Sequence, residues 1–136
     1  VSIVLNSMVV VYLLNYFFLL LLFSCNAVVK ESINKKYDSL PIDSKIASVE
    51  VNQNIPDKSE LLGTMRFSDS GFSTDCDFYS NLSKARKRAR EIGANIIKIT
   101  QSKSPDIISS CHRMKLEFYK FEGDVSNIRQ IQLQAN

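Results

Sequence analysis

The amino-terminal stretch of the chain is almost entirely apolar. Residues 1–24 contain no charged side chain, and all 17 basic and 14 acidic residues follow them. Residues 8–23 read MVVVYLLNYFFLLLLF, in which Asn15 is the only strongly polar side chain. A run of about 20 apolar residues can cross a bilayer, whereas the core of a secretory signal is shorter. The pattern predicts a segment directed to a membrane, followed by a polar chain.

The pattern changes twice in the next forty or so residues. Residues 26–45 are polar and include Pro41, which is typical of a tether. Residues 46–51 then alternate, with Ala47, Val49 and Val51 on one face, and predict a strand. After a turn at 52–58, residues 61–67 predict a second strand, in which Gly63 marks a bulge or a close approach.

A helix is predicted over residues 78–92. Asp75 or Asp77 is a suitable N-cap at the end of the loop 68–77, and Gly93 is a typical terminating glycine. At helical spacing, the apolar positions form a narrow stripe that is expected to face a sheet: Phe78, Leu82, Ala85, Ala89 and Ile92.

Two further strands are predicted after the helix, at 94–100 and 111–121, separated by a loop that contains Pro105. In the last strand Met114, Leu116 and Phe118 alternate with polar residues, which is typical of an antiparallel sheet with one wet face. The expected fold is α+β, with a small, mostly antiparallel sheet of about four strands and one helix on one face, in the order ββαββ. The domain is expected to cover 46–121, with a polar tail at 122–136.

The end of the apolar stretch resembles the lipobox of bacterial lipoproteins. Residues 22–25 read Leu-Phe-Ser-Cys, and the resemblance implies cleavage after residue 24, a lipidated Cys25 and a tether over 25–45. Phe23 is bulkier than the small residue usual there, and no Lys or Arg precedes the apolar run. The alternative is a retained anchor, with Lys30, Lys35 and Lys36 holding a membrane-anchored domain in the cytoplasm.

The number of cysteines also bears on whether the domain lies outside or inside the cytoplasm. The chain has three cysteines: Cys25, Cys76 and Cys111. If Cys25 carries lipid, two remain, and they can pair as one disulfide in an oxidising compartment. The alternative is a pair of buried thiols in a reducing cytoplasm.

Three stretches carry a family resemblance: LGTMRFSDSGFSTDCDF, ARKRAREIGANIIKIT and SSCHRMKLEFYKF. They resemble small Bacteroidota-type lipoproteins with a glycine-phenylalanine-x-x-x-cysteine loop and, more distantly, the outer-membrane lipoprotein that senses envelope stress for the Rcs phosphorelay. The resemblance covers residues 60–121 and the signal. It implies a lipid on Cys25 and a structural disulfide between Cys76 and Cys111. The Rcs sensor family has two disulfides, whereas this domain has cysteines for one.

The predicted helix is strongly basic, within a chain of formal net charge +3. Its cations are Lys84, Arg86, Lys87, Arg88 and Arg90. One interpretation is a solvated face, supported by a Lys87–Glu91 pair. The other is a docking surface for an anionic partner, such as lipopolysaccharide phosphates, a phospholipid headgroup or an acidic protein surface. Nucleic acid is not an expected partner.

Candidate chemistry is sparse. His112 is the only histidine, and as a strand neighbour of Cys111 it points to the other face. A zinc site of Cys76, Cys111, His112 and either Asp75 or Asp77 has no familiar spacing, so a disulfide is preferred. We expect no catalytic residue, no metal and no cofactor.

Taken together, these patterns predict a lipid-anchored protein of the cell envelope that binds a partner or senses envelope stress. Asn26 after the lipidated cysteine favours the outer membrane, with the domain facing the periplasm. The partner is expected to be another envelope protein or an anionic envelope surface. The alternative is a periplasmic lipoprotein that binds a small ligand or a metal through residues 68–77 and His112.

Overall fold

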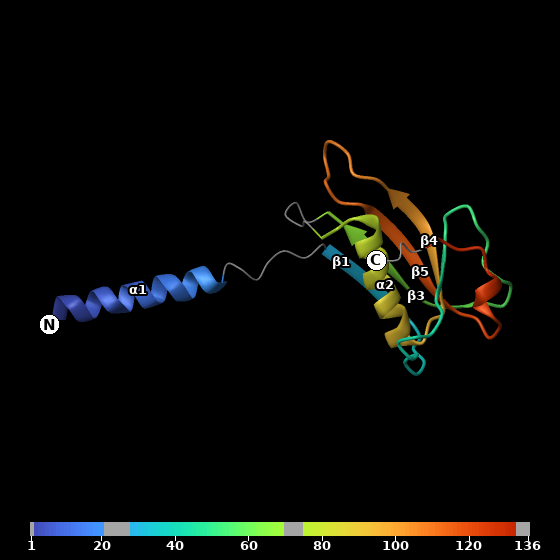
Figure 1. Cartoon of the computed structure of the whole chain (residues 1–136), viewed down its shortest axis with the longest axis horizontal. Helices are drawn as coiled ribbons and strands as arrows, with labels where there is room; N and C mark the ends of the chain where they lie inside the picture. The colour runs from blue at the N-terminus through green and yellow to red at the C-terminus, as the bar shows by residue number, and fades with distance from the viewer. Residues whose placement is uncertain (1, 21–27, 70–74, 133–136) are drawn as a thin grey trace.

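The protein folds as an α+β domain around one mixed five-stranded sheet, preceded by a separate helix (Figure 1). The computed structural model describes residues 2–20, 28–69 and 75–132, so Cys25 lies outside the described residues. Along the chain, the elements are α1 (Ser2–Leu20), β1 (Val28–Ile33), β2 (Ala47–Val49), β3 (Glu60–Ser68), α2 (Phe78–Ile92), β4 (Ile96–Lys103), β5 (Arg113–Lys120) and a 3₁₀ turn (Val125–Asn127). The order across the sheet is β1-β3-β5-β4-β2.

The apolar amino-terminal segment forms α1, which extends away from the sheet in Figure 1. Its large apolar side chains from Met8 to Leu14, together with Tyr16 and Phe17, are exposed. None of the helices in the described part of the chain combines the length and hydropathy that a bilayer span requires.

The sheet has one strand more than the four expected. β1 pairs antiparallel with β3, from Val28 opposite Ser68 to Ile33 opposite Gly63, and lies within the predicted tether. It is an edge strand whose side chains are mostly exposed, so its sequence shows no apolar alternation. Gly63 allows the close pairing, because a Cβ there would lie 2.5 Å from the carbonyl oxygen of Ser32. The register shift between Leu61 and Gly63 confirms the predicted bulge.

The sheet is mostly antiparallel, as expected, but it is a mixed sheet. β2 pairs with β4 in parallel, with Ala47 opposite Ile96. All three residues of β2 are buried, as expected for a strand covered on both faces. Its outer edge is partly covered because the backbone N–H of Ile131 donates to the carbonyl of Ser48 at 2.8 Å.

The helix prediction is confirmed in its bounds, its caps and its buried face. The N-cap is Asp77, whose carboxylate accepts from the backbone N–H of Ser80 at 2.9 Å. The C-cap is Gly93, in the left-handed region at φ 78°. The predicted stripe packs on the sheet, with Leu82, Ala85, Ala89 and Ile92 fully buried and Phe78 half-buried against the same core.

Two apolar clusters lie on opposite faces of the sheet. The larger one fills the space between α2 and the sheet, and includes Leu62, Phe67, Leu116 and Phe118. The smaller one lies on the other face, where Val125 and Ile128 pack near β2 and β4. Part of the predicted polar tail therefore contributes to the folded domain.

Replacement of Gly93 tests the close packing at the end of α2. We expect Gly93→Ala to lower the free energy of unfolding by about 1–3 kcal/mol, because a positive φ is unfavourable for alanine. In addition, a Cβ at this position would lie 2.7 Å from the Cβ of Tyr37 and 2.8 Å from the carbonyl oxygen of Asp38. Denaturant unfolding measures the loss. Lys58→Gly, at an exposed residue with φ 64°, is the control and should lose little or nothing; equal losses would contradict this account.

Candidate functional site

A groove runs beside the carboxyl-terminal half of α2. It has a volume of about 440 Å³ and is lined by Ser39, Leu40, Ile42, Ser83, Arg86, Lys87, Arg90 and Glu91. We call it the basic groove. Helix α2 supplies its charged wall, and residues 39–42 supply a partly apolar wall on which Ile42 is 89% exposed.

The second wall is held in place by the end of the helix. The backbone N–H groups of Tyr37 and Leu40 donate to the carbonyls of Ile92 and Arg90, at 3.0 and 2.9 Å. The Ser39 hydroxyl donates to the carbonyl of Glu91 at 3.1 Å. The last carbonyls of a helix have no partner within it, so this segment satisfies them and is positioned by them.

The predicted basic helix divides into two groups, and the first is neutralised by neighbouring carboxylates. Lys84 donates to the Asp75 carbonyl at 2.7 Å, with its Nζ 3.2 Å from the Asp75 carboxylate. Arg88 binds both carboxylate oxygens of Glu31 on β1, at 2.8 and 2.9 Å, and donates to Glu91 at 2.9 Å. Glu91 therefore pairs with Arg88, whereas the sequence suggested Lys87.

The second group, Arg86, Lys87 and Arg90, lines the basic groove. Arg86 donates to the carbonyl of Ile46 at 2.7 Å and to the Ser48 hydroxyl at 3.1 Å. Arg90 makes a longer contact of 3.4 Å to the carbonyl of Ser44, and its buried Nε has no partner among the described residues. Neutral oxygens leave the charge of an arginine uncompensated.

The charges of Arg86, Lys87 and Arg90 favour the binding of an anion in the basic groove. Burial, followed by the nearby charge of Arg90, lowers the pKa of Arg86 below its ordinary value. Lys87 is exposed at the rim. A carboxylate or phosphate entering the basic groove would relieve the repulsion between the two guanidinium groups and form charge-assisted hydrogen bonds.

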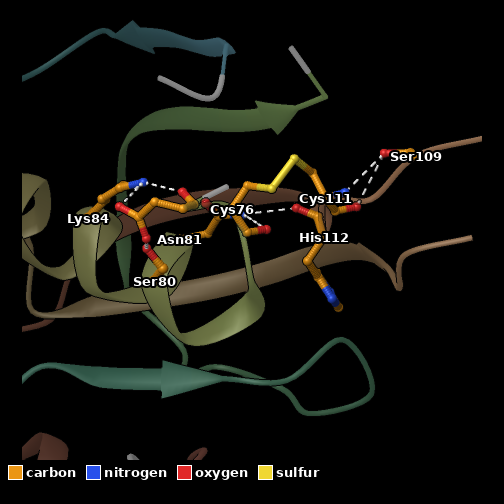
Figure 2. The surroundings of a disulfide bond; sticks show 8 residues. Cys76, Ser80, Asn81, Lys84, Ser109, Cys111 and His112 are labelled. Carbon is orange, nitrogen blue, oxygen red and sulfur yellow. Dashed lines mark hydrogen bonds and ion pairs between the residues drawn. A yellow bond between two sulfur atoms is a disulfide. The ribbon is translucent and has the colours of Figure 1, made fainter. Parts of the chain in front are cut away.

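The predicted disulfide is present. Cys76 and Cys111 are joined by an S–S bond of 2.02 Å. Both are buried, with 3% of Cys76 and 1% of Cys111 exposed. Figure 2 shows the bridge between the start of α2 and the segment that leads into β5. Around it, the N–H of His112 donates to the Cys76 carbonyl at 2.9 Å, and the Asn81 amide donates to the His112 carbonyl at 2.8 Å. The bridge pins the helix start to the sheet, as expected.

The imidazole of His112 points away from the bridge (Figure 2). Its Nε2 lies 2.7 Å from the Ser102 hydroxyl, and its ring meets Phe78 edge-on at 5.1 Å. Burial, followed by the charge of Arg113, lowers the pKa of His112. No carboxylate in the described part of the chain hydrogen-bonds this ring, so a serine-histidine-carboxylate triad is not assembled.

Zinc ligation by the two cysteines is incompatible with the disulfide, because both sulfurs are bonded to each other. Among residues 2–20, 28–69 and 75–132, no group of three or more side chains of the metal-ligating types is close enough to hold an ion. The contact between Ser102 and His112 could not be predicted from the sequence, because it depends on the register of β4 against β5.

No family model, no curated protein and no solved structure matches this chain.

Removal of the bridge tests its structural role. The double variant Cys76→Ser with Cys111→Ser is expected to lose about 3–4 kcal/mol of unfolding free energy, because the bridge closes a long loop in the unfolded chain. Denaturant unfolding of the variant and of the reduced native chain should give similar losses. A loss below about 1 kcal/mol in both would show that packing alone holds the start of α2.

Proposed function

We propose that this protein is a lipid-anchored protein of the cell envelope that binds an acidic segment of another envelope protein in the basic groove. The observation that carries the proposal is the arrangement of Arg86, Lys87 and Arg90 along one wall of a groove whose other wall is partly apolar. In this proposal the protein has no catalytic role and serves as a binding or envelope-stress sensing module.

The disulfide supports the proposed location in the cell envelope. Bonds of this kind persist in oxidising environments and are rare in cytosolic proteins. With Cys76 and Cys111 paired, Cys25 is the one cysteine left of the three in the chain, and the lipobox-like residues 22–25 give it a role as the lipid site. Lipid attachment at that point would place the domain outside the cytoplasm, where the bridge can form.

The chemistry of the partner follows from the two walls of the basic groove. The helix wall presents three cations. Lys87 is exposed, and within the described part of the chain the two arginines have only neutral oxygen partners. Opposite them, the exposed side chain of Ile42 offers an apolar contact. An acidic segment that also carries apolar side chains would satisfy both walls, as is common where charges provide specificity and apolar groups provide area.

The lipid anchor is tested by the intact mass of the protein extracted from its host and alkylated without reduction. We expect the mass of residues 25–136 plus acyl chains, with no alkyl group added. An uncleaved chain carrying three alkyl groups would instead establish a retained anchor with reduced thiols, and would overturn the proposed compartment.

Charge reversal at Lys87 tests the basic groove. Arg86 is unsuitable because it is half-buried and hydrogen-bonded to the backbone of Ile46, so its replacement would disturb folding. We expect Lys87→Glu to weaken binding of a labelled peptide of alternating Glu and Leu by at least roughly tenfold, as measured by fluorescence anisotropy.

Lys58→Glu is the matched control, because Lys58 is exposed on the turn before β3 and changes the net charge equally. It should retain most of the affinity. If the two variants lose affinity to the same extent, the peptide senses net charge and the basic groove is not its site.

A further inference from the structure

Four strand ends share one end of the sheet. Val28 lies opposite Ser68, Phe67 opposite Met114, and Met114 opposite Ser102. The start of β1, the end of β3, the start of β5 and the end of β4 are therefore neighbours. The connection 104–112 between β4 and β5, which we call the isoleucine loop, extends beyond this end (orange in Figure 1).

The isoleucine loop presents two large apolar side chains to solvent. Ile107 is fully exposed and Ile108 is 91% exposed, so neither contributes to a core. The turn that carries them is nevertheless held by several hydrogen bonds. The N–H groups of Ile108 and Ser109 both donate to the Asp106 carboxylate at 2.9 Å, and the N–H of Asp106 donates to the Ser109 carbonyl at 2.8 Å.

The base of the loop is anchored as well. Ser109 is buried, and Cys111 carries the disulfide. The Asp106 carboxylate forms an ion pair with Arg113 at 2.6 Å, and this contact, with the two backbone N–H donors, lowers the pKa of Asp106 to about 2. A fixed turn with two exposed isoleucines has no explanation within the fold, and it points to a contact outside the domain.

Cations cluster beside this loop, on the sheet face turned away from α2. Lys30 lies opposite Arg66, and Arg66 lies opposite Lys115, so three like charges form a row across three strands. A depression of about 180 Å³ on this face is lined by Arg66, Phe67, Gln101, Lys103, Arg113, Met114 and Lys115.

These charges are available to a ligand. Lys30, Arg66, Lys103 and Lys115 are all exposed, and none forms an ion pair with another described residue. The acids near this surface include Asp106, which is paired with Arg113, and Asp69. Glu117 lines a neighbouring hollow together with Lys30, Arg66 and Lys115. Neighbouring like charges across a sheet destabilise it, and a bound anion would relieve that repulsion.

We infer that this end of the domain docks on an anionic phospholipid bilayer, with Ile107 and Ile108 entering the interface and a lipid phosphate in the depression between Arg66, Lys103 and Lys115. The inference deepens the proposed function and rests on its membrane attachment. Cys25 precedes Val28 by three residues, which can span at most about 11 Å. A lipid on Cys25 would therefore emerge beside this end of the sheet.

A bilayer fits both components of this surface. Exposed apolar side chains insert among headgroups, and basic side chains attract anionic lipids. Either contribution alone gives only weak membrane binding. Together they would orient a tethered domain against the membrane and leave the basic groove beside α2 accessible.

A single introduced tryptophan tests the docking, because the chain contains none. The full chain carrying Ile108→Trp is added to vesicles of phosphatidylcholine, with or without phosphatidylglycerol, that contain brominated acyl chains. We expect a blue shift and quenching of the indole in the anionic vesicles, both weakened by high salt. Ile42→Trp, at an equally exposed isoleucine on the basic groove, is the control and should remain unquenched.

The charges are tested by adding Lys103→Glu and Lys115→Glu to the Ile108→Trp chain. Each basic side chain near an anionic surface contributes about fivefold to binding, so reversing two should weaken docking by at least roughly 20-fold. Co-sedimentation with vesicles is measured in parallel, to report on attachment through the amino-terminal segment.

If the chain sediments with both kinds of vesicle but the indole at position 108 stays solvent-exposed, the docking inference is overturned while membrane attachment stands. The isoleucine loop would then be a protein contact. If the chain sediments with neither, docking is overturned too, and the proposed lipid anchor is decided separately by the intact mass of the protein from its host.

Discussion

The bond between Cys76 and Cys111 is the constraint on which both candidate surfaces depend. It joins the residue before the N-cap of α2 to the segment that enters β5. On one side it fixes where the helix begins, and hence how its buried stripe and its basic face lie relative to residues 39–42. On the other side it closes the base of the isoleucine loop. Because the folded domain is small, one covalent link of this kind supplies a large share of its stability.

The pairing of charges decides which cations remain available. Glu31 on the edge strand and Asp75 before the helix neutralise Arg88 and Lys84, so part of the basic helix serves to attach α2 to its surroundings. Arg86 supports β2 through the backbone of Ile46 and the hydroxyl of Ser48. Two groups of the remaining cations stand out. Arg86, Lys87 and Arg90 line the basic groove, and Lys30, Arg66, Lys103 and Lys115 lie on the opposite face of the sheet, beside the isoleucine loop.

These two surfaces lie on opposite sides of the sheet, since α2 covers one face and the row from Lys30 to Lys115 lies on the other. A protein that contacts a membrane through one face and a partner through the other can act as a bridge between them. Both proposed contacts are electrostatic in part, so ionic strength would affect both. The apolar residues differ in kind, because Ile42 forms part of a groove, whereas Ile107 and Ile108 project from a turn.

Sequence alone determined the parts of this protein whose signals are local. The helix Phe78–Ile92, its caps at Asp77 and Gly93 and its buried stripe follow from spacing within one segment. The count of cysteines allowed the bridge between Cys76 and Cys111 but equally allowed two buried thiols. Tertiary structure decided everything that depends on pairing between distant segments. β1 has no apolar alternation because it is an exposed edge, and its place is set by backbone hydrogen bonds and by the missing side chain of Gly63. The parallel pairing of β2, the ion pair between Arg88 and Glu31 and the row of Lys30, Arg66 and Lys115 all depend on which strands pair and in which register. Such pairing joins residues far apart in the chain, so the pattern within one segment does not reveal its partner.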